Sequence, residues 1–170
     1  MTALHVLMVC LGNICRSPMA QGALEAAARA GGLAVRVDSA GVMGWHEGAA
    51  PDARAMAAAS RRGLDITGQR ARAVVAQDFH ACDLVLAMDA RVHDALRAQR
   101  PPAARASLGL LLDYAPHLGR RDVPDPYYGG ADAFDRALDL IEHGVAGLVP
   151  HLRAMAEMGG ESQNLSQREG

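Results

Sequence analysis

The 170-residue chain contains no lysine, so all 17 of its basic side chains are arginine. This absence excludes Schiff-base catalysis by a lysine. It also excludes the lysine with which P-loop NTPases and protein kinases hold ATP phosphates. The formal net charge is −2, whereas a domain with a broad nucleic-acid-binding surface is usually basic. We therefore expect no nucleic-acid partner.

The chain also lacks long apolar runs. No segment approaches the roughly 18 apolar residues that a membrane helix needs, and the N-terminus has neither the basic segment nor the apolar core of a signal peptide. We therefore predict a cytoplasmic protein without membrane insertion. With three cysteines and no signal peptide, free thiols are expected rather than a disulfide framework. The alanine-rich, lysine-free composition suggests a GC-rich bacterial genome.

Short apolar segments alternate with longer alanine-rich segments. The apolar segments predict strands at residues 3–10, 34–37, 83–88 and 107–112. Helical periodicity and capping residues predict helices at residues 17–30, 52–62, 89–100 and 131–158. This alternation favours an α/β fold, a three-layer sandwich with a four-stranded parallel sheet and helices on both faces. We expect a single domain over residues 1–158 and a polar, disordered tail over residues 159–170.

Ligands of such sheets bind beyond the carboxyl ends of the strands. The candidate site loops are therefore the segments that follow the first, second and fourth predicted strands, residues 10–17, 39–51 and 113–130. This expectation depends on topology alone.

The first of these loops has the composition of an anion site. It begins with Cys10 at the end of a strand and finishes with Arg16 at the start of a helix, and Gly12 and Asn13 tolerate left-handed backbone angles. Such a loop can turn its backbone N–H groups inward, and a guanidinium can bind two phosphate oxygens at once. The same positive field stabilises a thiolate, which can attack phosphorus. We interpret Cys10 as a nucleophile beneath a bound phosphoryl group.

The loop after the fourth predicted strand supplies a candidate acid. Asp125 lies between two prolines that restrict its backbone, and Tyr127 and Tyr128 follow it. A general acid that protonates a leaving phenolate contributes about 10²–10⁴ in rate. Asp122, in the same loop, is less rigidly held and is interpreted as a surface residue.

These motifs resemble the low-molecular-weight protein-tyrosine phosphatase family. The segment Val9–Pro18 matches the family's phosphate loop, and Asp125–Tyr128 matches its acid loop. Further family landmarks follow in order over roughly residues 4–155: Asp38–Gly41, Pro51-Asp52 and Met88-Asp89.

The resemblance implies catalytic roles for four residues. Cys10 would be the nucleophile of a phosphocysteine intermediate, and Arg16 would clamp the phosphate. Asp125 would act first as general acid and then as general base. Ser17 would donate a hydrogen bond to the Cys10 sulfur. For support, Asn13 would hold the backbone of the phosphate loop, with Ser39 as its partner.

The resemblance also implies how the substrate binds. Trp45 would flank the substrate ring, and Tyr127 and Tyr128 would form the opposite wall. The implied substrate-binding residues are Leu11, Gly12, Asn13, Ile14, Cys15, Trp45, Tyr127 and Tyr128. The implied partner is a phosphotyrosine protein or a small aryl phosphate, with inorganic phosphate or vanadate as competitive ligands. No metal or other cofactor is implied.

Two features leave alternatives open. Cys15 forms a Cys-x4-Cys pair with Cys10 and is a candidate redox partner that would trap an oxidised nucleophile as a disulfide. Gln69 lies near the position where many family members carry a histidine that is hydrogen-bonded to the Asn–Ser network. Glutamine can also form hydrogen bonds, so we expect the phosphate loop to be altered in detail but still functional.

Two other functions compete with a phosphatase. A thioredoxin-coupled arsenate reductase of the same fold would need further cysteines. Cys82 precedes the third predicted strand, but seven residues later, where a partner cysteine would be expected, the chain has Asp89. A non-catalytic phosphate-binding module would not need Cys10, Ser17 and Asp125 together.

Overall fold

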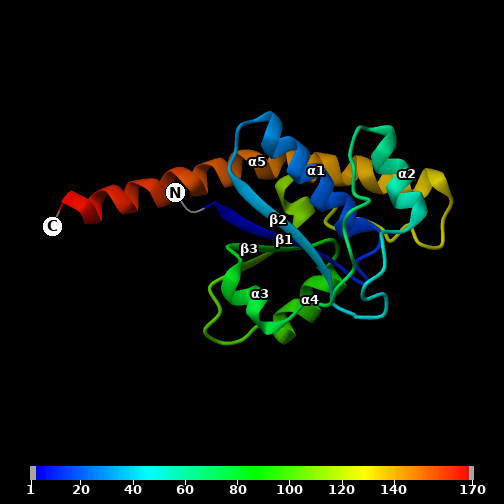
Figure 1. Cartoon of the computed structure of the whole chain (residues 1–170), viewed down its shortest axis with the longest axis horizontal. Helices are drawn as coiled ribbons and strands as arrows, with labels where there is room; N and C mark the ends of the chain where they lie inside the picture. Colours follow the sequence, from blue (N-terminus) through cyan, green and yellow to red (C-terminus); the bar gives the residue numbers. More distant parts are fainter. Residues whose placement is uncertain (1–2, 169–170) are drawn as a thin grey trace.

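A computed structural model describes residues 3–168 of the chain, and the surroundings of its side chains as far as residue 159 (Figure 1). The strands are β1 (Leu4–Cys10), β2 (Val35–Gly41), β3 (Leu84–Ala87) and β4 (Ser107–Leu110). The helices are α1 (Arg16–Ala30), α2 (Ala53–Arg61), α3 (Ala76–Ala81), α4 (Ala90–Gln99) and α5 (Ala131–Arg168). Two short 3₁₀ turns, η1 (Leu111–Tyr114) and η2 (Pro116–Leu118), follow β4.

The four strands form one parallel sheet in the order β2-β1-β3-β4. β1 is apolar at nearly every position because it is hydrogen-bonded on both edges and covered on both faces. The chain leaves β1 for β2 on one side and later returns to β3 on the other. This reversal opens a crevice at the carboxyl end of β1. The predicted sandwich is confirmed.

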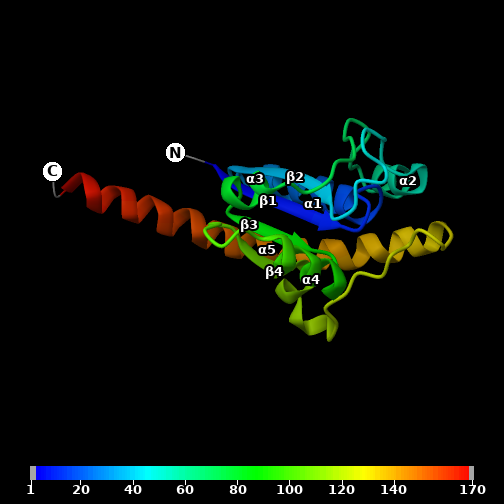
Figure 2. The same ribbon diagram turned by 90° about the horizontal axis from the view of Figure 1, so that it is seen from below.

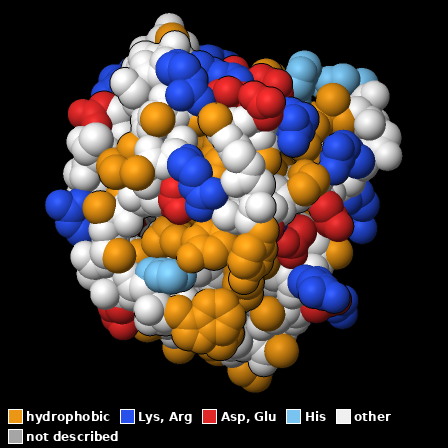
Figure 3. Space-filling model, turned by 90° about the vertical axis from the view of Figure 1, so that its right-hand side faces the viewer, with side chains coloured by type: hydrophobic (Ala, Val, Ile, Leu, Met, Phe, Trp, Pro, Cys, Tyr) orange, Lys and Arg blue, Asp and Glu red, His pale blue; other side chains and the backbone are white. Residues whose placement is uncertain are grey.

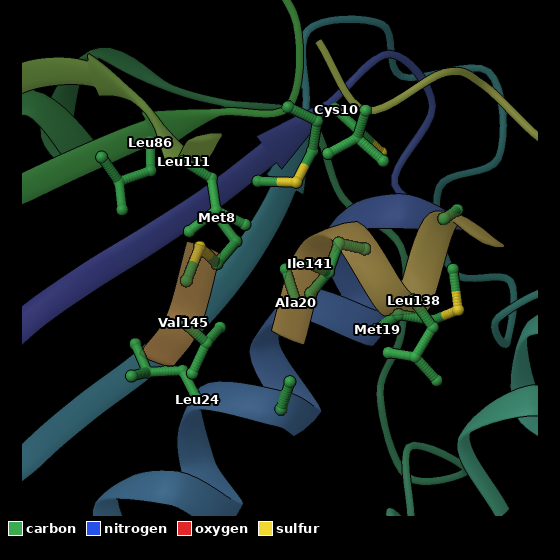
Figure 4. Close-up of a cluster of buried hydrophobic side chains, with 14 of the residues drawn as sticks. Met8, Cys10, Met19, Ala20, Leu24, Leu86, Leu111, Leu138, Ile141 and Val145 are labelled. Atoms are coloured by element: carbon green, nitrogen blue, oxygen red, sulfur yellow. The ribbon is translucent and has the colours of Figure 1, made fainter. Parts of the chain in front are cut away.

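The two faces of β1 pack into separate cores because successive side chains of a strand point in opposite directions. Val6, Met8 and Cys10 face the larger core, which α1, α2 and α5 enclose. Figure 4 shows Met8 in that core among aliphatic side chains such as Leu24, Ile141 and Val145. Leu7 and Val9 face the smaller core, to which α3 and α4 contribute Phe79, Val92 and Leu96.

Some boundaries differ from the sequence-based prediction. β2 extends to Gly41, beyond the predicted end at residue 37, because it pairs with β1 along its whole length although it contains Asp38 and Ser39. α3 was not predicted, since its six residues are too short for a helical period to be recognised.

The predicted disordered tail differs most. α5 continues through Gly159 to Arg168, so the structure gives a helix where the sequence pattern indicated none. Two consecutive glycines lower helix propensity, but the residues after them include no proline that would end the helix. The last turns of α5 extend past the sheet (Figures 1 and 2), and residues 169–170 lie outside the described residues. None of the described helices combines the length and apolar character that crossing a bilayer requires.

Glycine allows η1 to approach α5 closely. A Cβ added to Gly147 would collide with the backbone carbonyl of Tyr114, and one added to Gly144 would lie 2.7 Å from the Leu111 side chain. The 3₁₀ turn after β4 can therefore pack directly on the helix backbone. This contact helps to set where the following loop, residues 119–130, begins.

We predict that Gly147→Ala lowers the free energy of unfolding by about 1–3 kcal/mol, because the new methyl group meets a backbone atom that cannot rotate away. Urea denaturation followed by circular dichroism measures the change. Gly159→Ala in the same helix is the control, since a Cβ there meets nothing within 4 Å. Equal stability of the Gly147→Ala variant and the wild-type protein would contradict the proposed packing.

Candidate active site

A pocket of about 220 Å³ lies at the carboxyl ends of the strands. The three loops that topology singled out meet there, and the pocket is lined by Cys10, Leu11, Gly12, Ile14, Cys15, Arg16, Trp45, His46, Asp125, Tyr127 and Tyr128. Figure 3 views the molecule from this end, where hydrophobic side chains gather around a histidine. The surface at this end of the molecule is thus largely apolar around the histidine.

Cys10 lies on the floor of the pocket as the last residue of β1, and it is only 3% exposed. Its sulfur is 3.0 Å from the Ser17 hydroxyl, the contact that the resemblance implied. α1 begins at Arg16, and no side chain caps its N-terminus. Its first backbone N–H groups and its positive dipole end are therefore available to an anion above Cys10.

The Arg16 side chain is 97% buried between three segments of the chain. Its Nη1 donates to Asp89 Oδ2 at 2.6 Å and to the Val123 carbonyl at 2.8 Å. Its Nη2 lies 3.7 Å from Asp125 Oδ2. Burial opposes the charge, but nearby Cys10 and Asp89 outweigh it and raise the pKa of Arg16. A fixed cation thus lies beside the sulfur.

Asp125 lines the other side of the pocket, with its side chain 40% exposed. Its Oδ1 accepts the Tyr127 N–H at 3.1 Å, and its Oδ2 is the oxygen nearest Arg16. Asp122 lies outside the pocket, where its carboxylate accepts the Ala90 N–H at the start of α4. The geometry therefore agrees with the preference for Asp125 over Asp122.

Aromatic side chains form the rim. Trp45 is 64% exposed, Tyr127 40% and Tyr128 96%. The two tyrosine rings pack edge to face at 5.0 Å, and Trp45 reaches the pocket from the loop after β2. His46 lies against Gly12 of the first loop and also lines the pocket. Exposed aromatic faces beside a polar floor suit a ligand with a flat apolar body and an anionic end.

The loop between Cys10 and Arg16 is held in an unusual backbone conformation. Asn13 has φ = 58° and is the only non-glycine residue with positive φ in the described part of the chain. Its amide donates to Ser17 Oγ at 2.8 Å and to Ser39 Oγ at 3.0 Å, so the contact implied with Ser39 is present. The Asn13 side-chain oxygen, Oδ1, accepts the Arg72 backbone N–H at 3.1 Å. These bonds offset the strain of the left-handed residue.

Comparison with known proteins identifies the chain's relatives. The family model described as "Low molecular weight phosphotyrosine protein phosphatase" matches residues 5–158. The low molecular weight protein-tyrosine-phosphatase of Streptomyces coelicolor is 41% identical over 158 residues, which cover 90% of this chain and 96% of that protein. The chain belongs to the low molecular weight protein-tyrosine phosphatase family.

Solved structures of similar proteins have the same fold. The crystal structure of YfkJ from Bacillus subtilis is 36% identical, with a TM-score of 0.85 over 91% of this chain and 98% of that one. Wzb of Vibrio vulnificus, in complex with benzylphosphonate, is 27% identical, with a TM-score of 0.78 over 88% of this chain and 99% of that one. The family resemblance drawn from the motifs is thus confirmed.

The sequence did not indicate that Asp89 and Arg72 support the phosphate loop and its arginine. Asp89 was treated as a helix start and a family landmark, but it also binds Arg16 while its other oxygen caps α4 through the Val92 N–H. Arg72 was not singled out, although its guanidinium bridges Asp38 and Asp78. An aspartate N-cap at the end of a buried strand was the available signal for Asp89. No local signal indicated Arg72.

Gln69 contacts the Asn–Ser network but does not line the pocket. Its amide donates to the Pro18 carbonyl at 3.0 Å, and its Oε1 lies 3.5 Å from Ser39 Oγ. The single proton of the Ser39 hydroxyl is donated to the nearer acceptor, Gln21 Oε1, at 2.8 Å. Gln69 thus contacts the Asn–Ser network, as expected from its position.

The other two cysteines lie in different surroundings. Burial and then the Asp52 carboxylate raise the pKa of Cys15 from 9.0 to about 12, while burial and Asp78 raise the pKa of Cys82 to about 11. Cys82 packs in the smaller core. Because Val6 pairs with Leu84, Cys10 and Cys82 are offset by six strand residues, or about 20 Å.

We predict that the free energy of unfolding falls as the pH rises above 9. The unfolded chain then releases the Cys15 and Cys82 protons that the folded protein retains, which costs about 1.4 kcal/mol per pH unit for each thiol until its folded pKa is reached. Urea titrations at pH 8, 9, 10 and 10.5 measure the slope. Cys15→Ala should reduce it, and an unchanged slope in that variant would contradict the assignment.

Proposed function

We propose that this family member hydrolyses phosphotyrosine and related aryl phosphates through a phosphocysteine intermediate on Cys10. The observation that carries the proposal is the convergence, in one pocket, of the Cys10 sulfur, the buried Arg16 guanidinium and the Asp125 carboxylate. A nucleophile, an anion clamp and a proton donor are the three groups that this reaction needs. Family membership and the names of the relatives support the same activity.

In the first step, the phosphate binds to the N–H groups of the loop and to Arg16, and the Cys10 thiolate attacks phosphorus. The S–P bond forms while the bond to the ester oxygen breaks, and protonated Asp125 gives its proton to the leaving phenolate. Arg16 is held by Asp89 and Val123, so it neutralises transition-state charge without moving.

In the second step, water attacks phosphorus and Asp125, now a carboxylate, accepts a proton from it. The S–P bond breaks, and the sulfur leaves as a thiolate. The Ser17 hydroxyl, 3.0 Å from the sulfur, stabilises that negative charge by a hydrogen bond. The same carboxyl group thus acts as acid and then as base.

The rim supports an aryl substrate. Trp45, Tyr127 and Tyr128 line the pocket and can pack against a phenyl ring, and such aromatic pairs add about 0.5–1.5 kcal/mol beyond burial. Within the loop, Leu11, Gly12, Ile14 and Cys15 line the pocket, while Asn13 supports the loop from beneath. Wzb was solved in complex with benzylphosphonate, a ligand that carries a phosphonate on an aromatic group, and this supports the same substrate class. Phosphate and vanadate are expected to compete.

Cys15 is proposed as a redox guard. A peroxide would oxidise Cys10 to the sulfenic acid, and the Cys15 thiol would displace water to give a disulfide that a cellular thiol later reduces. Both cysteines line the pocket. A cytoplasmic location, where thiols are kept reduced, suits this cycle.

An arsenate reductase is less well supported. Its disulfide relay would need a third cysteine near the pocket, whereas Cys82 lies in the other core, about 20 Å from Cys10. The aromatic rim would have no role in arsenate binding.

We predict that Cys10→Ser reduces hydrolysis of p-nitrophenyl phosphate to less than a few per cent of wild type, because a hydroxyl in this site is a far weaker nucleophile. Cys82→Ala, at a buried cysteine outside the pocket, serves as the control and should remain active. Arsenate reduction with thioredoxin is assayed in parallel. Substantial activity of the Cys10→Ser variant, or Cys82-dependent arsenate reduction, would overturn the proposal.

We predict that Asp125→Ala slows phenyl phosphate by about 10²-fold or more in kcat/KM, and slows activated esters much less, because only poor leaving groups need the proton. A series of substituted phenyl phosphates measures the dependence on leaving-group pKa. Asp122→Ala in the same loop is the matched control and should leave the series unchanged. An equal loss across the series would remove the acid role from Asp125.

A further inference from the structure

The N-terminus of α2 lies between the two segments that carry the chemistry. The Asp52 N–H donates to the Ile14 carbonyl of the phosphate loop at 2.8 Å. The Asp52 carboxylate then caps α2 by accepting the Arg54 N–H, also at 2.8 Å. The first turn of α2 is thus tied directly to the loop that follows Cys10.

The Arg54 side chain continues this connection to the acid loop, residues 124–130. Its Nε and Nη2 donate to the two Asp52 carboxylate oxygens, each at 3.0 Å, and its Nη1 donates to the Gly129 carbonyl at 2.9 Å. Its Cζ lies 4.6 Å from the centre of the Phe134 ring and 5.6 Å from that of Tyr127. One planar group therefore contacts α2, the acid loop and the start of α5.

The acid loop has few other attachments. Its own backbone supplies two bonds, from Tyr127 to Asp125 and from Gly129 to Pro126. Before the loop, Val123 is anchored to the Met88 carbonyl. Among residues 3–159, Arg54 is the only side chain from another element that hydrogen-bonds the loop backbone, apart from the ionic contact of Asp125 with Arg16.

We propose that Arg54 is a positioning residue that couples the acid loop to the phosphate loop and so aims Asp125 at the ester oxygen. The path runs from Ile14 through Asp52 and Arg54 to Gly129, four residues beyond Asp125. The proposal rests on the proposed function, since it assumes that Asp125 donates a proton to the ester oxygen and that its position affects the rate. Lysine could not replace Arg54, because an ammonium lacks the planar fork that holds Asp52 while a further N–H binds elsewhere.

The partial exposure of the Arg54 side chain distinguishes a positioning role from a role in stabilising the fold. The Arg54 side chain is 38% exposed, and exposed ion pairs contribute little to the stability of a folded protein. Its loss should therefore change unfolding only slightly. A small displacement of Asp125 would change the rate, because proton transfer depends on geometry at hydrogen-bond distance.

The test uses Arg54→Met and Arg54→Gln in the full chain, with Arg61→Met as the matched control. Arg61 lies on the same helix and forms a comparable ion pair with Asp135, but it does not contact the acid loop. We expect the Arg54 variants to lose about tenfold in kcat/KM for phenyl phosphate and less than about twofold for the most activated esters. Arg61→Met should match the wild-type protein throughout.

Adding Arg54→Met to Asp125→Ala provides the decisive comparison. If Arg54 acts through Asp125, the double variant is no slower than Asp125→Ala alone. A uniform loss across leaving groups, or a further loss in the double variant, would overturn the positioning role. Absence of hydrolysis by the wild-type protein would instead overturn the proposed function.

Discussion

The buried guanidinium of Arg16 is the interaction on which the rest of the site depends. A charge that is 97% buried is costly unless it is paired and hydrogen-bonded. The partners are Asp89 at the N-cap of α4, the Val123 carbonyl before the acid loop, and Asp125 within that loop. Satisfying one cation therefore brings together three segments that are far apart in the sequence. These contacts place Asp125 beside Arg16 in the crevice that the reversal of strand order opens.

A second constraint acts on the phosphate loop. Asn13 is held in a left-handed conformation by bonds to Ser17 in α1, Ser39 in β2 and the backbone of Arg72 in the loop before α3. The loop is thus shaped before any ligand arrives, and its N–H groups need little rearrangement to bind an anion.

The sequence predicted the features that depend on local pattern. Alternating apolar segments indicated the parallel sheet, and the Cys10–Ser17 spacing indicated an anion loop, because strand, turn residues and helix start are adjacent in the chain. The choice of Asp125 over Asp122 followed from its two flanking prolines. Local pattern was less reliable for β2, whose polar end is stabilised by pairing with β1, and for α5, which continues past two glycines.

Amino-acid order by itself indicated the fold class, the family resemblance and most of the residues that line the pocket, although Asn13 supports the loop without lining the pocket. Only the tertiary structure decided which further groups, beyond Ser17, Asn13 and Ser39, support them. Asp89, Arg72 and Arg54 each act across tens of residues, and a salt bridge or capping bond between distant segments leaves no periodic trace in either segment. Such partners become visible only when folding has brought a buried charge or a strained backbone next to the group that satisfies it.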